Sequence, residues 1–209
     1  MPDSVPVLYS DGALIVIDKP AGLLSVPGRG AHLQDCAAVR VQARFPDAKI
    51  VHRLDQATSG LMVLARGVEA QRKLGRAFEA RRVVKRYVAV VVGLVGSDQG
   101  SIDLPLASDW PNRPRQQVDP ERGKPSLTRW QVISRDAGSA TTRLELEPLT
   151  GRSHQLRVHL LAIGHPIVGD ALYAGIAQIA SRLMLHASAL TIEHPDDARA
   201  MNFSSVVPF

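Results

Sequence analysis

The longest uninterrupted apolar stretch of the chain, residues 87–95, is too short to cross a membrane and is typical of a buried β-strand. Other short apolar or alternating runs predict further strands, at residues 13–18, 61–65, 126–133, 141–147, 182–187 and 189–192. Helical spacing of apolar residues marks only three segments, at residues 33–45, 68–82 and 153–163. Many strands with few helices, in no regular alternation, predict an α+β fold with a mixed, mainly antiparallel sheet flanked by helices and loops.

The length of 209 residues is that of one domain, since domains of ~150 residues are common. The start of the chain lacks a basic leader, and Asp18, Lys19 and Pro20 interrupt the first apolar segment, which is wrong for a secretory signal. The single cysteine, Cys36, has no partner for an internal disulfide and is expected to be a small core residue. We therefore expect a cytoplasmic protein that does not associate with membranes.

The charge balance favours anionic partners. There are 25 Lys and Arg against 20 Asp and Glu, a net charge of +5, which suits RNA, DNA or acidic lipid. One side of the predicted helix 68–82 is basic, with Arg72, Lys73, Arg76, Arg81 and Arg82. A solvated polar face and a phosphate-binding face are both compatible with that pattern.

Several common catalytic motifs are missing from the sequence. It has no G-x-x-x-x-G-K-[ST], and Gly28-Arg29-Gly30 is only a fragment of a dinucleotide fingerprint. His154 and His159 are five residues apart, so they do not form the i, i+4 pair of a zinc helix and are better read as hydrogen-bonded or surface histidines. A G-x-S-x-G elbow is also missing, which argues against a serine hydrolase. We expect neither a metal nor a nucleotide cofactor.

Two polar segments remain as candidate sites. Residues 51–60 hold one carboxylate, Asp55, near Arg53; an ionised Asp suits a nucleophile or an electrostatic partner, although it could also cap a turn and pair with Arg53 on the surface. Residues 151–159 place two Arg and two His at the start of a helix. These side chains could bind an anion together with the backbone N–H groups there, or they could simply form an exposed polar helix end. In addition, two prolines make the loop 109–115 around Trp110 rigid and presented.

Several ordered motifs together resemble the RluA family of pseudouridine synthases. They are KPAGLLSVPG at 19–28, HRLD at 52–55 with TSG at 58–60, KRYVA at 85–89, GRSHQLRVH at 151–159, GHPIVGD at 164–170 and RLMLHA at 182–187. The resemblance runs from about residue 7 onward. It implies the pseudouridine synthase fold, with residues 1–209 as a single catalytic domain without an N-terminal S4 domain.

Within the family, the segments 109–114 and 123–125 are most similar to the small members that modify stem-loops of both 23S rRNA and the tRNA anticodon arm. Two alternatives stay open. The chain could be a relative that modifies a different uridine of rRNA alone, or an RNA-binding protein without catalytic activity.

The resemblance also implies a reaction and the residues that perform it. Pseudouridylation breaks the N1–C1′ bond of a uridine and rejoins the ring through C5, so it needs no redox cofactor, metal or nucleotide. Asp55 matches the catalytic aspartate. The reaction could proceed through a sugar adduct, a base adduct or a glycal. Arg157 matches the arginine that pairs with that aspartate. Tyr87 matches the aromatic residue that stacks on the target uracil and assists removal of the C5 proton.

A stacked uridine must also be extruded, at a cost of a few kcal/mol. Arg53 matches the side chain that fills the vacated position. The predicted RNA-binding residues are Arg53, His52, Arg152, Arg113, Arg115, Arg72, Lys73 and Arg76. A small synthase of this kind is expected to be a monomer.

Overall fold

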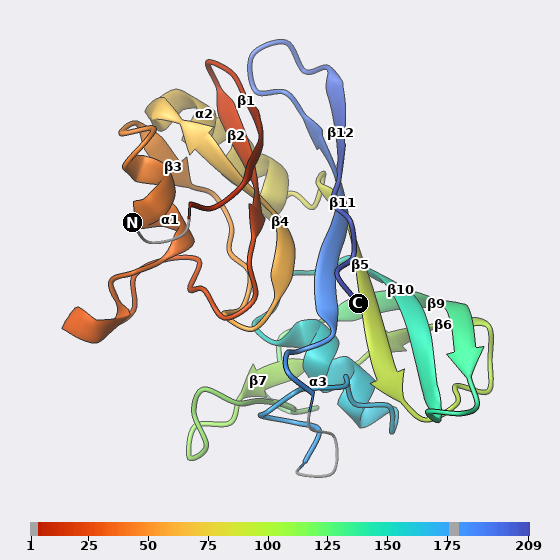
Figure 1. Ribbon diagram of the computed structural model, residues 1–209. Coiled ribbons are helices and arrows are strands. Elements are labelled where there is room, and N and C mark those ends of the chain that lie inside the picture. Colours follow the sequence, from red (N-terminus) through yellow and green to blue (C-terminus); the bar gives the residue numbers. More distant parts are fainter. Residues whose placement is uncertain (1–3, 176–179) are drawn as a thin grey trace. The chain divides into compact units, whose positions relative to one another are not determined.

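The computed structural model describes residues 4–175 and 180–209 (Figure 1). The chain divides into two compact units, which we call unit 1 (Met1–Lys85 and His186–Pro208) and unit 2 (Arg86–Leu185 with Phe209). Both changes of unit fall inside strands, β5 (Val84–Val92) and β11 (Leu185–Glu193). The single-domain organisation expected from the length stays a prediction.

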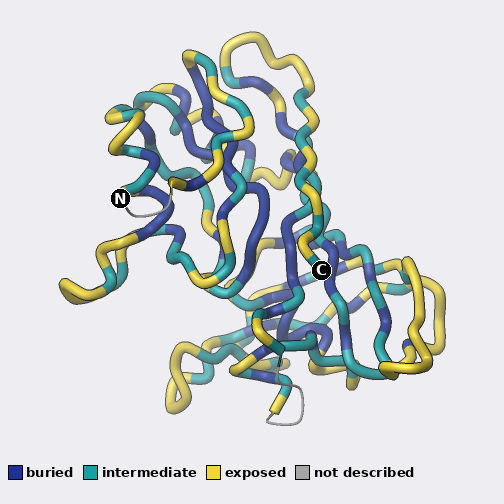
Figure 2. The backbone as a smooth tube through the Cα atoms, viewed as in Figure 1, coloured by how far each residue is buried: buried dark blue, intermediate teal, exposed yellow. Residues whose placement is uncertain are grey.

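Unit 1 contains a mixed sheet in the order β1-β2-β4-β11, with β3 on β4 and β12 on β11. The strands are β1 (Val7–Ser10), β2 (Leu14–Lys19), β3 (Ala48–Ile50), β4 (Ser59–Arg66), β11 and β12 (Ala200–Ser204). β4 and β11 are parallel, and the other neighbours in this unit are antiparallel. The apolar runs of β2 and β4 are buried along almost their whole length (Figure 2), as the sequence predicts.

Two helices pack against this sheet. α1 (Ala37–Gln42) contacts β3, and α2 (Gly67–Glu79) contacts β3 and β4. The sequence predicted one helix over residues 33–45, but a separate 3-10 turn occupies Ala31–Leu33 and α1 starts later. The reason is local, because the buried Cys36 caps α1 by accepting a hydrogen bond from the backbone N–H of Val39 at 3.5 Å.

The helix α2 is amphipathic as predicted. Ala70, Leu74 and Ala77 form its buried face, and its basic side chains lie on the exposed face. One of them, Arg72, forms a loose 3.6 Å ion pair with Glu69, and both side chains are largely exposed.

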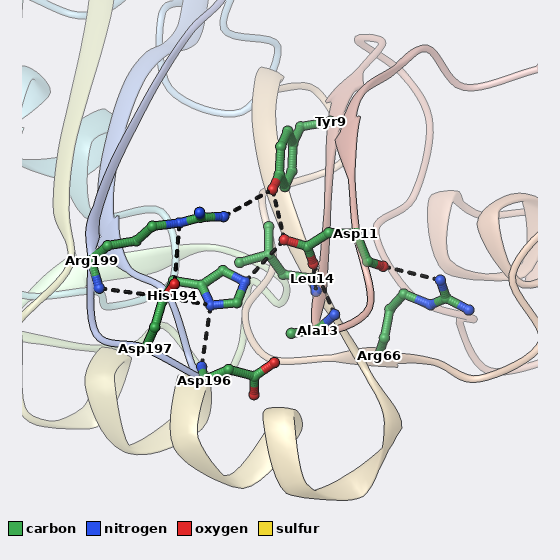
Figure 3. Close-up of polar contacts among 9 residues, drawn as sticks. All are labelled: Tyr9, Asp11, Ala13, Leu14, Arg66, His194, Asp196, Asp197 and Arg199. Atoms are coloured by element: carbon green, nitrogen blue, oxygen red, sulfur yellow. Dashed lines mark hydrogen bonds and ion pairs between the residues drawn. The ribbon is translucent and has the colours of Figure 1, made fainter.

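A polar cluster joins the β1–β2 turn to the β11–β12 turn (Figure 3). The carboxylate of Asp11 accepts hydrogen bonds from the Tyr9 hydroxyl at 2.6 Å and from the backbone N–H groups of Ala13 and Leu14 at 2.8 and 2.9 Å. It also lies 2.9 Å from Nε2 of the buried His194. Burial alone would raise the pKa of Asp11, but these hydrogen bonds outweigh it and hold that pKa well below its usual range. The cluster therefore holds the β1–β2 turn and the β11–β12 turn together.

Unit 2 contains an antiparallel sheet in the order β5-β10-β9-β6, and a separate two-stranded hairpin. The sheet strands besides β5 are β6 (Gln99–Asp103), β9 (Leu127–Asp136) and β10 (Thr141–Pro148); the hairpin strands are β7 (Leu106–Ser108) and β8 (Gln116–Val118). Strong alternation of buried and half-buried residues along β10 confirms the half-exposed strand predicted there.

The hairpin and the helix α3 (Gln155–Ala162) share a small core. Leu106 of β7, Val158 of α3 and Tyr173 form this cluster, with Val118 and Leu172 packed on it. The sequence correctly predicted α3 and its end near Gly164.

The prediction of two separate strands at 182–187 and 189–192 is wrong, because one continuous strand, β11, spans most of this segment. Parallel pairing with β4 at His186 and Ala187, followed by antiparallel pairing with β12 from Ala189 onward, carries the extended backbone through Ser188. The whole is an α+β arrangement of mixed, mainly antiparallel strands, which confirms the predicted class.

Candidate active site

The loop between β3 and β4 presents Asp55. Asp55 is half-buried, and it is preceded by the buried Leu54, which is only 6% exposed. The carbonyl of Asp55 accepts a hydrogen bond from the N–H of Thr58 at 3.1 Å, which closes a turn directly after the carboxylate. The loop therefore carries an acidic side chain on a short, turned backbone.

Ser25 holds the residue immediately before Asp55. Its hydroxyl donates to the carbonyl of Leu54 at 2.7 Å and accepts from the N–H of the same residue at 3.0 Å. Ser25 is 3% exposed, so both hydrogen bonds lie away from water. One hydroxyl thus satisfies both backbone groups of Leu54 and fixes its position.

Lys19 holds the residue immediately after Asp55. It is fully buried, and its Nζ donates to the carbonyls of Pro20, Leu23 and Gln56 at 2.9, 2.7 and 3.1 Å. Three carbonyls match the three N–H groups of an ammonium ion. Gly22 adds a backbone hydrogen bond to the carbonyl of Gln56 at 2.9 Å. Asp55 therefore lies between two residues that the segment 19–25 holds in place.

A third contact fixes the end of the loop where β4 begins. The Ser59 hydroxyl lies 2.8 Å from Nδ1 of the buried His186, whose Nε2 lies 3.0 Å from the Ser205 hydroxyl. The next residue, Gly60, has a φ of +112°, and a Cβ there would collide with the backbone of Ala187. Only glycine allows β4 to approach β11 so closely in this conformation.

His52 is part of the packing of this loop. Its Nε2 accepts a hydrogen bond from the N–H of Val63 at 2.9 Å, and its ring stacks on Phe78 with centroids 4.3 Å apart. Burial, assisted by the positive charge of Lys85, lowers the pKa of His52 to about 3. The ring is therefore neutral at pH 7, and the role of His52 as an RNA contact stays a prediction.

In unit 2, Arg157 on α3 forms a buried ion pair that sequence reasoning missed. Its Nε and one terminal nitrogen donate to the two carboxylate oxygens of Asp170 at 2.7 and 2.6 Å. The side chains are 5% and 0% exposed. A guanidinium has five N–H groups, and this pairing uses two of them. Asp170 thus fixes the orientation of Arg157.

Tyr173 connects Arg157 to its surroundings. Its ring centroid lies 5.0 Å from the Arg157 guanidinium, and its hydroxyl lies 2.8 Å from Nδ1 of His154. His154 has a left-handed backbone with φ of 53° at the start of α3. Burial lowers the pKa of His159, which lies within 3.0 Å of Leu104 O and 2.9 Å of Thr128 Oγ1. Both histidines are hydrogen-bonded, which confirms the simpler interpretation of this pair.

The remaining predicted residues occupy two kinds of position. Tyr87 is half-buried on β5, opposite Leu146 of β10. Arg152 is half-buried just before α3, with its Nε 3.4 Å from the carbonyl of Pro125. Arg115 is also half-buried. The other predicted RNA contacts are exposed, and they are Arg53, Arg72, Lys73, Arg76 and Arg113. Asp55 belongs to unit 1, and both Tyr87 and Arg157 belong to unit 2.

Comparison with known proteins identifies the family. Residues 13–162 match the family described as RNA pseudouridylate synthase. A dual-specificity RNA pseudouridine synthase RluA from Yersinia pestis is 52% identical over 205 residues, which cover 97% of this chain and 99% of that protein. The chain belongs to the RNA pseudouridylate synthase family. The RluA protein of Escherichia coli strain K12 is 49% identical, over 97% of this chain and 93% of its own length.

A solved structure agrees with this pseudouridylate synthase assignment. Human RNA Pseudouridylate Synthase Domain Containing 1 has a TM-score of 0.83 and 30% sequence identity, and the match covers 100% of this chain and 87% of that one. The resemblance seen in the sequence, the fold and the enzyme class are thereby confirmed. In the ranges that the structure describes, no helix is long and apolar enough to span a membrane.

Proposed function

We propose that this pseudouridine synthase isomerises uridines in stem-loops of both 23S rRNA and the tRNA anticodon arm. Identity of about half the residues over 97% of the chain to proteins named as dual-specificity synthases supports both substrate classes. We further propose that the enzyme works as a monomer in the cytoplasm.

The observation that carries the proposal is the held position of Asp55. Ser25 fixes Leu54 and Lys19 fixes Gln56, so the carboxylate is presented on a backbone held on both sides. A reacting group must be kept close to its productive geometry, because a displacement of about 1 Å can cost about 100-fold in rate. A merely solvated surface carboxylate would need no such support.

The reaction balances within one nucleotide. The N1–C1′ bond breaks, a C5–C1′ bond forms, and the proton leaves C5 while N1 gains one. We assign to Asp55 the stabilisation of, or attack on, the sugar or base during this exchange. We assign to Arg157, which Asp170 orients through two hydrogen bonds, the role of the arginine that the family resemblance pairs with the catalytic aspartate. Tyr87 would stack on the uracil and assist removal of the C5 proton.

We assign substrate binding to cations that are exposed or half-buried. Arg53 is exposed two residues before Asp55, which suits a side chain that enters the RNA stack as the uridine leaves it. Arg72, Lys73 and Arg76 on α2 would contact phosphates, as would Arg113, Arg115 and Arg152 in unit 2.

The test is a pseudouridine map of rRNA and tRNA, by carbodiimide labelling and primer extension, from cells with and without the gene. Loss of sites in both RNA classes is expected, and loss in rRNA alone would favour the single-substrate alternative. The Asp55→Asn variant should restore no site in the deletion strain, while purified variant binds a stem-loop within about tenfold of wild type. Restored sites would remove Asp55 from the catalytic role.

A further inference from the structure

An exposed tryptophan lies at the tip of the hairpin β7–β8. Trp110 is 67% exposed, in the loop that joins the two strands. The hairpin carrying it is labelled at β7 in Figure 1. Trp130, in contrast, is half-buried against Gly100. Burying an indole contributes a large apolar area to a fold or an interface, so this exposed ring is available to a partner.

Arg113 orders that ring. Its guanidinium lies 3.8 Å from the Trp110 ring centroid, and its Nε donates to the Trp110 carbonyl at 3.0 Å. The planar guanidinium stacks on one face of the indole. With Arg113 on the ring, Trp110 is still 67% exposed, so most of its surface is accessible to solvent.

The loop itself is held by internal hydrogen bonds. The N–H of Asp109 donates to Arg115 O, and the N–H of Arg115 donates to Asn112 O, both at 3.0 Å. The side-chain amide of Asn112 donates to both carboxylate oxygens of Asp109, at 3.0 and 2.9 Å. The acidic group of the loop is therefore engaged internally, and the loop presents the positive charges of Arg113 and Arg115.

The base of the loop is anchored next to Arg157. The N–H of Gln116 donates to the Tyr173 hydroxyl at 2.7 Å, and the Arg115 guanidinium lies 5.3 Å from the Tyr173 ring centroid. Arg157 lies 5.0 Å from the same ring. Tyr173 therefore sets the position of the Trp110 loop relative to a residue of the proposed site.

We propose that Trp110, ordered by Arg113, is a stacking platform for an unpaired nucleobase of the RNA substrate. Unpaired bases stack on aromatic rings and guanidinium planes, whereas paired bases within a duplex already have both faces covered. Arg113 and Arg115 would meet the phosphates beside that base. The inference rests on the proposed function and deepens it, since it requires an unpaired base at a set distance from the target uridine.

The first test uses Trp110 as its own reporter. The chain has two tryptophans, so the Trp130→Phe variant leaves Trp110 as the single indole. Titration with an RNA stem-loop should quench its fluorescence saturably. The same stem-loop with abasic residues in its loop keeps the phosphates but lacks the bases, and should quench at least fivefold less. Equal quenching by both RNAs would overturn the stacking role and indicate a charge contact.

The second test measures affinity. Trp110→Ala should weaken stem-loop binding by about 5- to 150-fold, the change in Kd that corresponds to stacking of one base. Trp110→Phe, which keeps an aromatic ring, should recover most of that loss. Ile133→Ala is the control, because Ile133 is also an exposed apolar residue of unit 2, at 53%, and should change Kd less than twofold. A wild-type Kd for Trp110→Ala would refute the platform.

These readouts separate the two proposals, because binding and quenching need no turnover. Suppose that quenching of Trp110 depends on the bases but the protein forms no pseudouridine in any RNA. That result would support the platform and refute the proposed function. Pseudouridine formation together with a wild-type Kd for Trp110→Ala would do the reverse.

Discussion

Replacing Ser25 by alanine tests whether the loop of Asp55 is held as the hydrogen bonds indicate. The substitution removes one hydroxyl, and it leaves both the N–H and the carbonyl of Leu54 without that partner in a site where Ser25 and Leu54 are 3% and 6% exposed. Each orphaned buried group costs about 1–3 kcal/mol. The expected loss is therefore about 2–6 kcal/mol of unfolding free energy, a large part of the ~5–15 kcal/mol that domains possess.

The substitution should also slow the chemistry, because Leu54 is bonded directly to Asp55. We expect the single-turnover rate at saturating enzyme to fall about 10- to 100-fold, the range that follows from a displacement of up to ~1 Å. The RNA Kd should stay within about twofold, since Ser25 is buried. Urea denaturation and rapid-quench assays on a stem-loop substrate measure these quantities.

Ser126→Ala provides the matched control. Ser126 is 1% exposed and belongs to unit 2, where its hydroxyl donates to the carbonyl of Lys124 at 2.8 Å. Its loss should cost about 0.5–1.5 kcal/mol of stability, because the N–H of Leu106 still donates to the Lys124 carbonyl at 3.0 Å. The rate should not change beyond about twofold. If Ser25→Ala retains the wild-type rate, or if both variants lose it equally, the hydrogen bonds of Ser25 do not position Asp55.

Three further variants examine other parts of the structure. The pKa of His52 is about 3 when folded and 6.5 when unfolded, so its contribution to stability is complete well above pH 6.5 and is lost as pH falls toward 3. In His52→Gln the loss of unfolding free energy between pH 6.5 and 5 should be smaller by about 1.6 kcal/mol, and an unaltered pH profile of urea midpoints would contradict this. Asp170→Asn should destabilise the protein by about 3–5 kcal/mol because it removes the buried carboxylate charge that pairs with Arg157. Glu193→Gln, in an ion pair that is half exposed, should cost less than about 1 kcal/mol in the same melts, and similar losses would be inconsistent with the burial of these pairs. Arg76→Gln should lower the slope of log Kd against log salt for RNA by about 0.7–0.9, and a slope equal to that of wild type would remove α2 from the RNA-binding surface.

Sequence patterns predicted the central elements because the local periodicity of their apolar residues indicates which side chains are buried. β4 and β5 are apolar runs, β10 alternates, and α2 shows one apolar face. The strands that were missed are short or polar, such as the QGSID of β6 and the QQV of β8. Their strand conformation comes from pairing with distant neighbours rather than from their own hydrophobicity.

The candidate site shows the same difference between features with a local sequence signal and features that depend on distant residues. A dense polar segment between apolar elements marked Asp55, but the hydrogen bonds that hold it come from residues about 30 positions earlier, beyond any local pattern. Lys19 did carry a signal, since a lysine that ends a buried apolar strand requires several acceptors. The pairing of Asp170 with Arg157 spans 13 residues and a turn, and no periodicity reveals it.

The order of the segments along the chain has a consequence for synthesis. Ser59 and His186, which meet where β4 and β11 run in parallel, are 127 residues apart, and almost all of unit 2 lies between them. On a translating ribosome the contiguous stretch 86–185 emerges before β11 exists, so unit 2 is able to fold first. The sheet that carries Asp55 waits for residues 186–208, because its closing contacts have the largest sequence separation. A nascent chain therefore completes the Trp110 loop before the contact between Ser59 and His186, at the end of the Asp55 loop, is able to form.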